Sequence, residues 1–297
     1  MSLVLRGIFP PLTTPFAPDG SLDLKAATAN VRKYNDTKLA GYVVLGSTGE
    51  SVYLREEEKL KVLQAVRAAA DRSKALIAGT GCEGTAETIE FTRRAADVGY
   101  QAALVRTPAY FKSQMTESAL ERHFRAVADS SPIPVLVYSV PQFTGVAVEA
   151  SLVARLAAHP NIAGIKESSG NVERVAQMLR LAPPEFQVVV GSATTLYPSL
   201  SLGAGGGILA VACALPELCV ELYQAFCQGD HARARSLQQR LLEPTVAVTS
   251  RYGIAGLKFA MELRGYAGGL PRAPLLPLDE AARAELTRIV RALDASS

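Results

Sequence analysis

Short apolar runs rich in β-branched residues recur along this chain at nearly regular intervals, and each run is continuously apolar rather than alternating. Continuous hydrophobicity over a few residues predicts a strand that is buried on both faces, as in a parallel sheet. The predicted strands cover residues 7–10, 41–45, 75–78, 102–105, 134–138, 162–165, 187–190 and 207–211. This series constrains the fold more than any other feature of the sequence.

Amphipathic helical patterns fill the intervals between the predicted strands. Thr85 is expected to cap a helix that stops at Gly99, and Thr116 is expected to cap the next helix. Eight alternations of strand and helix predict an α/β fold of the (β/α)8 TIM barrel type. The alternative is a doubly wound sheet. That fold usually carries a Gly-x-Gly-x-x-Gly loop after its first strand, and residues 10–16 contain none.

After Leu215 the pattern changes to helices only. Helical segments are expected at residues 216–228, 231–242, 246–263 and 280–293, with the proline-rich stretch 271–277 as a loop. We therefore expect a barrel over residues 1–225 and a C-terminal helical extension over residues 226–297 that packs on the barrel.

The composition excludes several classes of protein. A net charge of +3 over 297 residues, without basic runs, disfavours nucleic-acid binding. No apolar stretch approaches the roughly 20 residues of a membrane span. The first predicted strand begins near Gly7, which leaves no room for a leader peptide, so a cytoplasmic protein is expected.

The 4 cysteines and 3 histidines are scattered along the chain. No Cys-x-x-Cys pair is present, which indicates free thiols in a reducing compartment. The histidines form neither a pair nor a cluster, and zinc sites need three or more converging ligands. We therefore expect no bound metal.

Lys166 is the residue that most directly indicates a catalytic function. It follows an apolar pair in a segment that reads as a short buried strand. Desolvation there would disfavour the charged ammonium and leave a neutral amine for attack on a ketone. The alternative is a structural lysine that pairs with Glu167 or extends into solvent.

Other reactive groups are expected where barrel strands end, because active sites of this fold lie at the carboxyl ends of the strands. The turn Gly46-Ser47-Thr48-Gly49-Glu50 offers two hydroxyls and closely spaced backbone N–H groups, which suit a small carboxylate, although an ordinary turn has the same composition. Tyr138 lies at the end of another predicted strand. It is either a residue that transfers protons or a residue of the core. Tyr110 and Gly191 follow further strands.

Three motifs carry a family resemblance. They are Gly46-Ser47-Thr48-Gly49-Glu50, Tyr138-Ser139-Val140-Pro141-x-x-Thr144-Gly145 and Gly164-Ile165-Lys166-Glu167-Ser168. In order and spacing they resemble the signatures of the N-acetylneuraminate lyase / dihydrodipicolinate synthase family. The resemblance implies a (β/α)8 class I lyase with a C-terminal helical extension. Such enzymes form a lysine Schiff base with pyruvate or another 2-oxo acid, need no cofactor and are commonly homotetramers.

The resemblance also implies roles for individual residues. Lys166 would form the imine, and Tyr138 would move protons at the carbinolamine and at the substrate hydroxyl. Ser47 and Thr48 would hold the pyruvate carboxylate, and Thr48 would also link two tyrosine hydroxyls. Tyr110 would be the second tyrosine, which reaches the site of a neighbouring subunit.

Further positions bear on which substrate is used. Ser168 is a candidate contact for the distal part of the substrate, and Gly191 and Phe143 are expected to line the same site. Dihydrodipicolinate synthases usually carry an arginine at the position of Phe143, where it holds the carboxylate of aspartate semialdehyde. Phenylalanine cannot make that bidentate contact. Arg251 is a candidate partner for a second carboxylate, with a surface helix residue as the alternative.

Several activities remain open on the sequence. Motifs around Tyr138, His159 and Arg251 resemble 4-hydroxy-2-oxoglutarate aldolase most closely, which implies cleavage of 4-hydroxy-2-oxoglutarate to pyruvate and glyoxylate. Alternatives are dihydrodipicolinate synthase and an aldolase or dehydratase of sugar-derived 2-oxo acids. N-acetylneuraminate lyase is disfavoured because Ser139 replaces the usual asparagine. A metal-dependent aldolase and an inactive binding homologue are the other readings, although an inactive copy would be expected to lack Lys166 or Tyr138.

Overall fold

The computed structural model describes residues 4–294 and contains one eight-stranded sheet. The strands follow the order β1-β8-β7-β6-β5-β4-β3-β2, and the ladders from β3 to β8 are parallel. A parallel bridge between Pro11 and Val43 joins the segment after β1 to β2. The strands are β1 (Gly7–Phe9), β2 (Gly41–Val44), β3 (Ala75–Gly79), β4 (Ala102–Arg106), β5 (Val135–Ser139), β6 (Ile162–Glu167), β7 (Gln187–Val190) and β8 (Gly206–Ile208).

The architecture is a (β/α)8 barrel, and each predicted strand is confirmed. The last predicted strand is shorter than expected, because residues Ala210–Cys213 form a 3-10 helix. The helices are α1 (Leu24–Asn35), α2 (Glu56–Ala69), α3 (Thr85–Val98), α4 (Glu117–Ser130), α5 (Pro141–Thr144), α6 (Ala150–Leu156), α7 (Val172–Leu181), α8 (Leu196–Ser201), α9 (Pro216–Cys227), α10 (His231–Val246), α11 (Gly253–Leu263) and α12 (Glu280–Ala292).

The described chain divides into two compact units. The first contains the residues up to Gly7 and those from Leu76 to Ile208, and the second contains Ile8 to Ala75 and the residues from Leu209 onward. The predicted boundary between barrel and extension, at residue 225, falls within α9 and stays a prediction.

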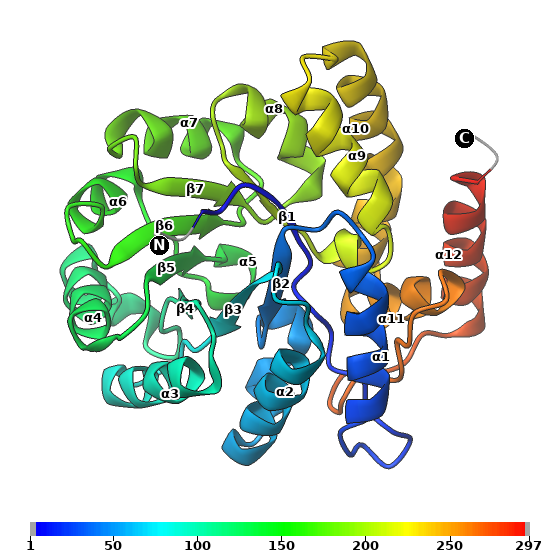
Figure 1. Ribbon diagram of the computed structural model, residues 1–297, viewed down its shortest axis with the longest axis horizontal. Coiled ribbons are helices and arrows are strands. Elements are labelled where there is room, and N and C mark those ends of the chain that lie inside the picture. The colour runs from blue at the N-terminus through cyan, green and yellow to red at the C-terminus, as the bar shows by residue number, and fades with distance from the viewer. Residues whose placement is uncertain (1–3, 295–297) are drawn as a thin grey trace. The chain divides into compact units, whose positions relative to one another are not determined.

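In the first unit, helices α3, α4, α6 and α7 lie along the outer side of strands β4 to β7 (Figure 1). Residues of β5 are buried along its whole length, as a strand covered on both faces requires. Thr116 caps α4 as predicted, since its side chain accepts a hydrogen bond from the Ala119 N–H. The prediction for Thr85 was wrong by one position: Gly84 is the N-cap, and Thr85 is the first residue of α3.

In the second unit, α9 lies beside α10 and α11 lies beside α12 (Figure 1). The continuous helix predicted over residues 246–263 is interrupted by a π-helical turn at Ala247–Arg251. Gly253, with φ of 55°, then starts α11. A right-handed helix cannot continue through a positive φ, so the two helices are separate elements.

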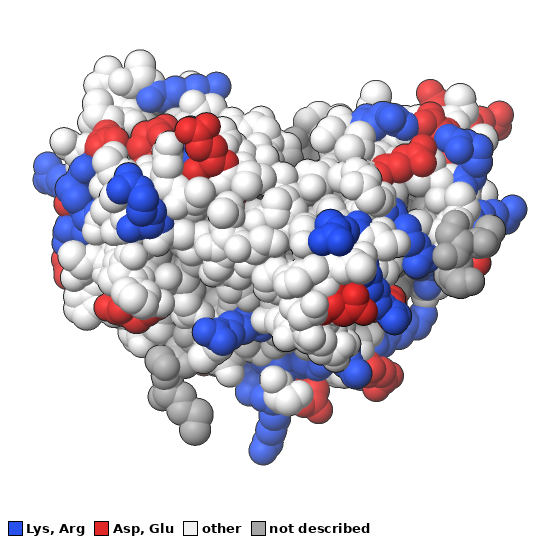
Figure 2. Space-filling model, turned by 90° about the horizontal axis from the view of Figure 1, so that it is seen from above, with Lys and Arg blue, Asp and Glu red and all other residues white. Residues whose placement is uncertain are grey.

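The surface in Figure 2 carries Lys and Arg interspersed with Asp and Glu rather than gathered into one patch of a single sign. Between residues 4 and 294, no helix is long and apolar enough to cross a membrane.

Arg272 ties the predicted loop at residues 271–277 to α2. Its Nη1 and Nη2 each donate to a carboxylate oxygen of Glu58 at 2.8 Å. This paired hydrogen bond from Arg272 holds the pKa of Glu58 at about 2, below the ordinary 4.5. Bidentate pairs between arginine and a carboxylate are stronger than single ones.

Glu58→Gln is expected to lower the free energy of unfolding by up to about 3 kcal/mol at pH 7. Because the folded-state pKa is depressed, this stabilisation is complete above pH 4.5 and is lost as the pH falls toward about 2. Urea unfolding between pH 7 and pH 3 should therefore show the variant and the native protein converging. Glu57→Gln is the matched control, since that side chain is 66% exposed; an equal loss there would contradict the account.

Candidate active site

Lys166 and Tyr138 are neighbours in the first unit. They pair in register across β6 and β5, and the Lys166 Nζ lies 4.2 Å from the centroid of the Tyr138 ring. Side chains in register on adjacent parallel strands point to the same face, so the amine and the phenol share one side of the sheet. Lys166 is 4% exposed and Tyr138 is 5% exposed. The predicted burial of Lys166 is confirmed.

Neither structural alternative for Lys166 is observed. The Glu167 carboxylate accepts the Ser169 N–H with both oxygens, at 3.1 and 3.0 Å, and burial raises the pKa of this carboxyl group. Among the described residues Lys166 has no ion-pair partner, and its burial keeps it out of solvent. The amine is therefore held against the phenol ring, without a carboxylate partner in the described chain.

Gly191 and Ser168 line the same region. A Cβ atom added at Gly191 would lie 3.2 Å from Lys166 Cε and 1.8 Å from Ser168 Oγ. Ser168 is 7% exposed, and its hydroxyl has no hydrogen-bond partner within the described part of the chain. A buried hydroxyl without a partner is uncommon in proteins and is available to a bound molecule. The structure thus brings Lys166, Tyr138, Ser168 and Gly191 together.

Gly191→Ala is expected to lower the free energy of unfolding by about 1–3 kcal/mol, because the added methyl group overlaps Ser168 Oγ and crowds Lys166. Gly84→Ala is the control in the same unit, since its nearest new neighbour would lie 3.9 Å away. Chemical denaturation of both variants checks this prediction. Equal stability of the two variants would mean that the short distances from Gly191 to Ser168 and Lys166 do not require a glycine at this position.

Tyr110 and Phe143 lie outside the buried pair. Tyr110 is 80% exposed and packs edge-on against Phe111 with ring centroids 5.0 Å apart. Phe143 lies on α5 and is 68% exposed. Neither ring is covered within the first unit.

Glu83 supports the Tyr110 turn. Its Oε2 accepts hydrogen bonds from the N–H groups of Ala109 and Tyr110 at 2.8 and 2.9 Å, and its Oε1 accepts one from Arg106 Nη1 at 2.7 Å. Sequence reasoning missed this residue. A carboxylate just after the third strand was the available signal, because strand ends carry the functional groups of a barrel.

Ser47 and Thr48 belong to the second unit, in a 3-10 turn at Ser47–Gly49. Thr48 is buried and Ser47 is half-buried. Leu45 and Glu50 flank the turn with positive φ values of 63° and 54°. Non-glycine residues rarely adopt this conformation, and such strain gathers at functional turns. The predicted carboxylate-binding role of this turn stays a prediction.

Arg251 lies in the π-helical turn and forms an ion pair with Glu285 of α12. The Tyr252 hydroxyl also donates to Glu285. The Arg251 side chain is 43% exposed. These contacts fit the alternative of a surface helix residue better than a partner for a substrate carboxylate.

Comparison with known proteins gives the class of the protein. Residues 4–293 match the model of the dihydrodipicolinate synthetase family. A 4-hydroxy-tetrahydrodipicolinate synthase of Methanothrix thermoacetophila is 40% identical over 288 residues, covering 97% of this chain and 96% of the relative. The enzyme of the same name from an Exiguobacterium strain is 38% identical, covering 95% of this chain and 96% of that one.

Solved structures agree with these relatives. Dihydrodipicolinate synthase of Bacillus anthracis matches with a TM-score of 0.93 and 30% identity, covering 98% of this chain and 99% of that chain. YagE, a prophage protein of E. coli K12 solved in complex with pyruvate, matches with a TM-score of 0.92 and 31% identity, at the same coverage of both chains. The protein is thus a (β/α)8-barrel lyase. It belongs to the dihydrodipicolinate synthetase family, whose members are lyase-type Schiff-base enzymes.

The predicted family is therefore confirmed, whereas the closer resemblance to 4-hydroxy-2-oxoglutarate aldolase is not shown by these relatives. Their shared name supports the alternative activity, dihydrodipicolinate synthesis, over the cleavage reaction favoured by the sequence motifs.

Proposed function

We propose that this protein is a class I aldolase or lyase in which Lys166 forms a Schiff base with pyruvate or a related 2-oxo acid. The observation that carries the proposal is the buried Lys166 amine, 4.2 Å from the centre of the Tyr138 ring and without a carboxylate partner in the described chain. The pyruvate complex of YagE, a protein of similar fold and sequence, supports pyruvate as the ligand.

The chemistry follows from an amine and a phenol on one face of the sheet. The lone pair of the Lys166 amine attacks the C2 carbonyl of pyruvate to give a carbinolamine, and protonation of the carbinolamine hydroxyl followed by loss of water gives a protonated imine. The imine withdraws electrons from C3, so loss of a C3 proton gives an enamine that attacks an aldehyde carbon and forms the C3–C4 bond. Cleavage is the reverse: the C4 hydroxyl loses its proton, the C3–C4 electrons move into the imine to give an enamine, and the aldehyde leaves. Protonation at C3 restores the imine, and its hydrolysis releases pyruvate.

Other residues take the roles that the resemblance implies. Tyr138 transfers the protons at the carbinolamine and at the substrate hydroxyl. Ser47 and Thr48 bind the carboxylate of pyruvate, and the unpartnered Ser168 hydroxyl contacts the distal part of the substrate. A homotetramer would give the exposed Tyr110 ring a neighbouring subunit to reach. Cytoplasmic location stays a prediction from the sequence.

Two reactions compete as the physiological one. The names of the relatives favour condensation of pyruvate with aspartate semialdehyde. Phe143 disfavours that condensation, since it stands where these synthases usually carry a carboxylate-binding arginine, and its ring offers no charged donor. The motifs around Tyr138, His159 and Arg251, which resemble 4-hydroxy-2-oxoglutarate aldolase, favour cleavage of 4-hydroxy-2-oxoglutarate. Sugar-derived 2-oxo acids remain a third class of substrate.

A direct comparison of substrates tests the proposal. The protein is incubated, with a chelator present, either with pyruvate and aspartate semialdehyde or with 4-hydroxy-2-oxoglutarate alone. Rapid consumption of the first pair supports the synthase, and rapid release of pyruvate from the second supports the aldolase. Activity that disappears with the chelator would contradict a Schiff-base mechanism and support a metal-dependent one.

A further inference from the structure

A buried ion pair lies next to the Ser47–Gly49 turn, within the second unit. Lys258 of α11 is 0% exposed, Glu50 is 2% exposed, and Lys258 Nζ lies 2.6 Å from Glu50 Oε1. Lys258 Nζ also donates to the carbonyl oxygens of Thr14 and Leu270, each at 2.8 Å. The ammonium is therefore surrounded by three oxygen atoms with no access to water.

Burying two charges is costly, and such a pair is a poor means of gaining stability alone. Several kcal/mol of desolvation per ion offset much of the attraction, so an apolar pair of similar volume is often as stable. The attraction instead fixes the geometry of the residues that carry the charges. At Glu50 this matters, because its φ of 54° is strained for a residue with a side chain.

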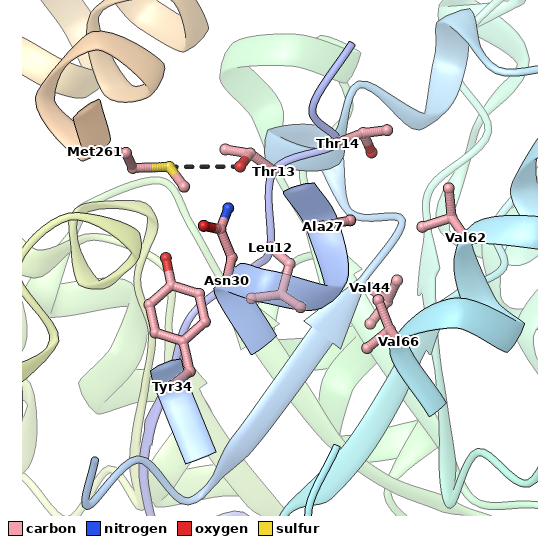
Figure 3. Close-up of a pocket in the computed structure, with 10 residues that line it drawn as sticks. All are labelled: Leu12, Thr13, Thr14, Ala27, Asn30, Tyr34, Val44, Val62, Val66 and Met261. Atoms are coloured by element: carbon pink, nitrogen blue, oxygen red, sulfur yellow. Dashed lines mark hydrogen bonds between the residues drawn. The ribbon is translucent and has the colours of Figure 1, made fainter. Parts of the chain in front are cut away.

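A second set of contacts reaches the same turn through residues 13 and 14. Figure 3 shows the Thr13 hydroxyl directed at the sulfur of Met261, which lies on α11 one turn after Lys258. The Thr14 hydroxyl donates to the Gly49 carbonyl oxygen at 2.7 Å, and the Thr14 carbonyl oxygen accepts Lys258 Nζ. Helix α11 is thus linked to both Gly49 and Glu50.

The loop after α11 adds a third contact. The Arg272 N–H donates to Glu50 Oε2 at 2.8 Å, so the Glu50 carboxylate is held by Lys258 on one oxygen and by Arg272 on the other. The Arg272 guanidinium is itself anchored on Glu58. Glu50 is therefore fixed from two segments of the C-terminal region.

We propose that Lys258 is a positioning residue: through Glu50 and Thr14 it holds the Ser47–Gly49 turn in its strained conformation and so sets the affinity for the pyruvate carboxylate. The inference rests on the proposed function, in which Ser47 and Thr48 bind that carboxylate. It assigns the helical C-terminal region a role in substrate binding, exerted without any contact between Lys258 and the substrate.

The test measures how much pyruvate is needed to form the imine. Borohydride trapping is carried out over a range of pyruvate concentrations with the native protein, Lys258→Met and Glu50→Gln. Lys258→Met is expected to raise the half-saturating pyruvate concentration about 10- to 100-fold, because small displacements of binding groups cost that much. The trapping rate at saturating pyruvate should change far less, since Lys166 and Tyr138 are untouched.

Lys74→Met is the matched control. Lys74 lies in the same unit, is 9% exposed, and donates to the carbonyl oxygens of Thr37 and Leu39, with no carboxylate within ion-pair distance among residues 4–294. It should lose stability but keep the half-saturating concentration of the native protein. Should Lys258→Met fail to fold, Glu50→Gln, which keeps the side-chain shape, carries the test and should show the same kind of shift.

Two outcomes would overturn the inference. One is a half-saturating pyruvate concentration that stays at the native value in folded Lys258→Met. If only Glu50→Gln folds, the same result in that variant counts equally. The other is an equal shift in Lys74→Met, which would reduce the effect to general destabilisation. Absence of trapping in the native protein is a different failure: it would contradict the proposed function itself, and the inference with it.

Discussion

Lys166→Met is expected to abolish turnover, by at least about 10⁴-fold, while leaving the barrel folded. A methionine has no nucleophile, and loss of a covalent nucleophile typically removes most of the catalytic rate. The fold should tolerate it, because Lys166 is buried without an ion-pair partner in the described chain, and a methionine of similar length needs no polar contacts there. Thermal unfolding should therefore give a melting temperature equal to or above that of the native protein.

Lys258→Met is the matched comparison for Lys166→Met. Lys258 is as deeply buried, but its amine is paired with Glu50 and bonded to two carbonyl oxygens. Removing it leaves a buried carboxylate unpaired, which destabilises a protein by several kcal/mol in typical cases. Lys166→Met should thus be inactive and stable. Lys258→Met should be destabilised and still able to form the imine at high pyruvate concentration. Residual turnover in Lys166→Met would exclude Lys166 as the nucleophile.

Tyr138→Phe is expected to lower turnover about 10²- to 10⁴-fold, the range for loss of a positioned acid or base. The phenyl ring keeps the packing against Lys166, so stability and the circular dichroism spectrum should stay close to native. The amine remains, so the pyruvate adduct should still form, but more slowly, because protonation of the carbinolamine hydroxyl has lost its donor. Single-turnover kinetics with pyruvate, followed by borohydride quench at increasing times, measure that slowing.

Ser139→Ala provides the control on the neighbouring position of β5. Its hydroxyl accepts the Val148 N–H at 3.3 Å, and adjacent residues of a strand point to opposite faces. The variant should be less stable than the native protein, because the Val148 N–H is left unpaired, but its turnover should stay near native. Near-native turnover in Tyr138→Phe would remove Tyr138 from the mechanism.

The barrel strands were predictable because burial on both faces leaves a local signature. A strand such as β5 must be apolar at every position, not at alternate ones, and this pattern can be read without knowing its neighbours. Lys166 stood out for the same reason, as a charged residue within such a run. Helix ends were predicted correctly at Thr116, whose side chain caps α4, and at Gly99, the glycine that ends α3, but the start of α3 was missed by one residue because Gly84 has no side chain to mark it as a cap.

The contacts that hold the candidate site were not predictable. Glu50 and Lys258 are far apart in the sequence, and nothing local marks either as a partner of the other. The same holds for Glu83, whose carboxylate supports the backbone of Tyr110. The break before α11 was also missed, because helical periodicity on both sides of Gly253 looks continuous and only the backbone conformation interrupts it.

Mapping the pyruvate adduct on the native protein tests the central claim most directly. The protein is incubated with pyruvate, reduced with borohydride, digested and analysed by mass spectrometry, and Lys74 and Lys258 serve as internal comparisons, since both are buried lysines. We predict one adduct, on the peptide that contains Lys166, because the amines of Lys74 and Lys258 each donate to two carbonyl oxygens, whereas that of Lys166 has no oxygen partner among the residues that the structure describes. An adduct on another lysine, or none at saturating pyruvate, would contradict the account.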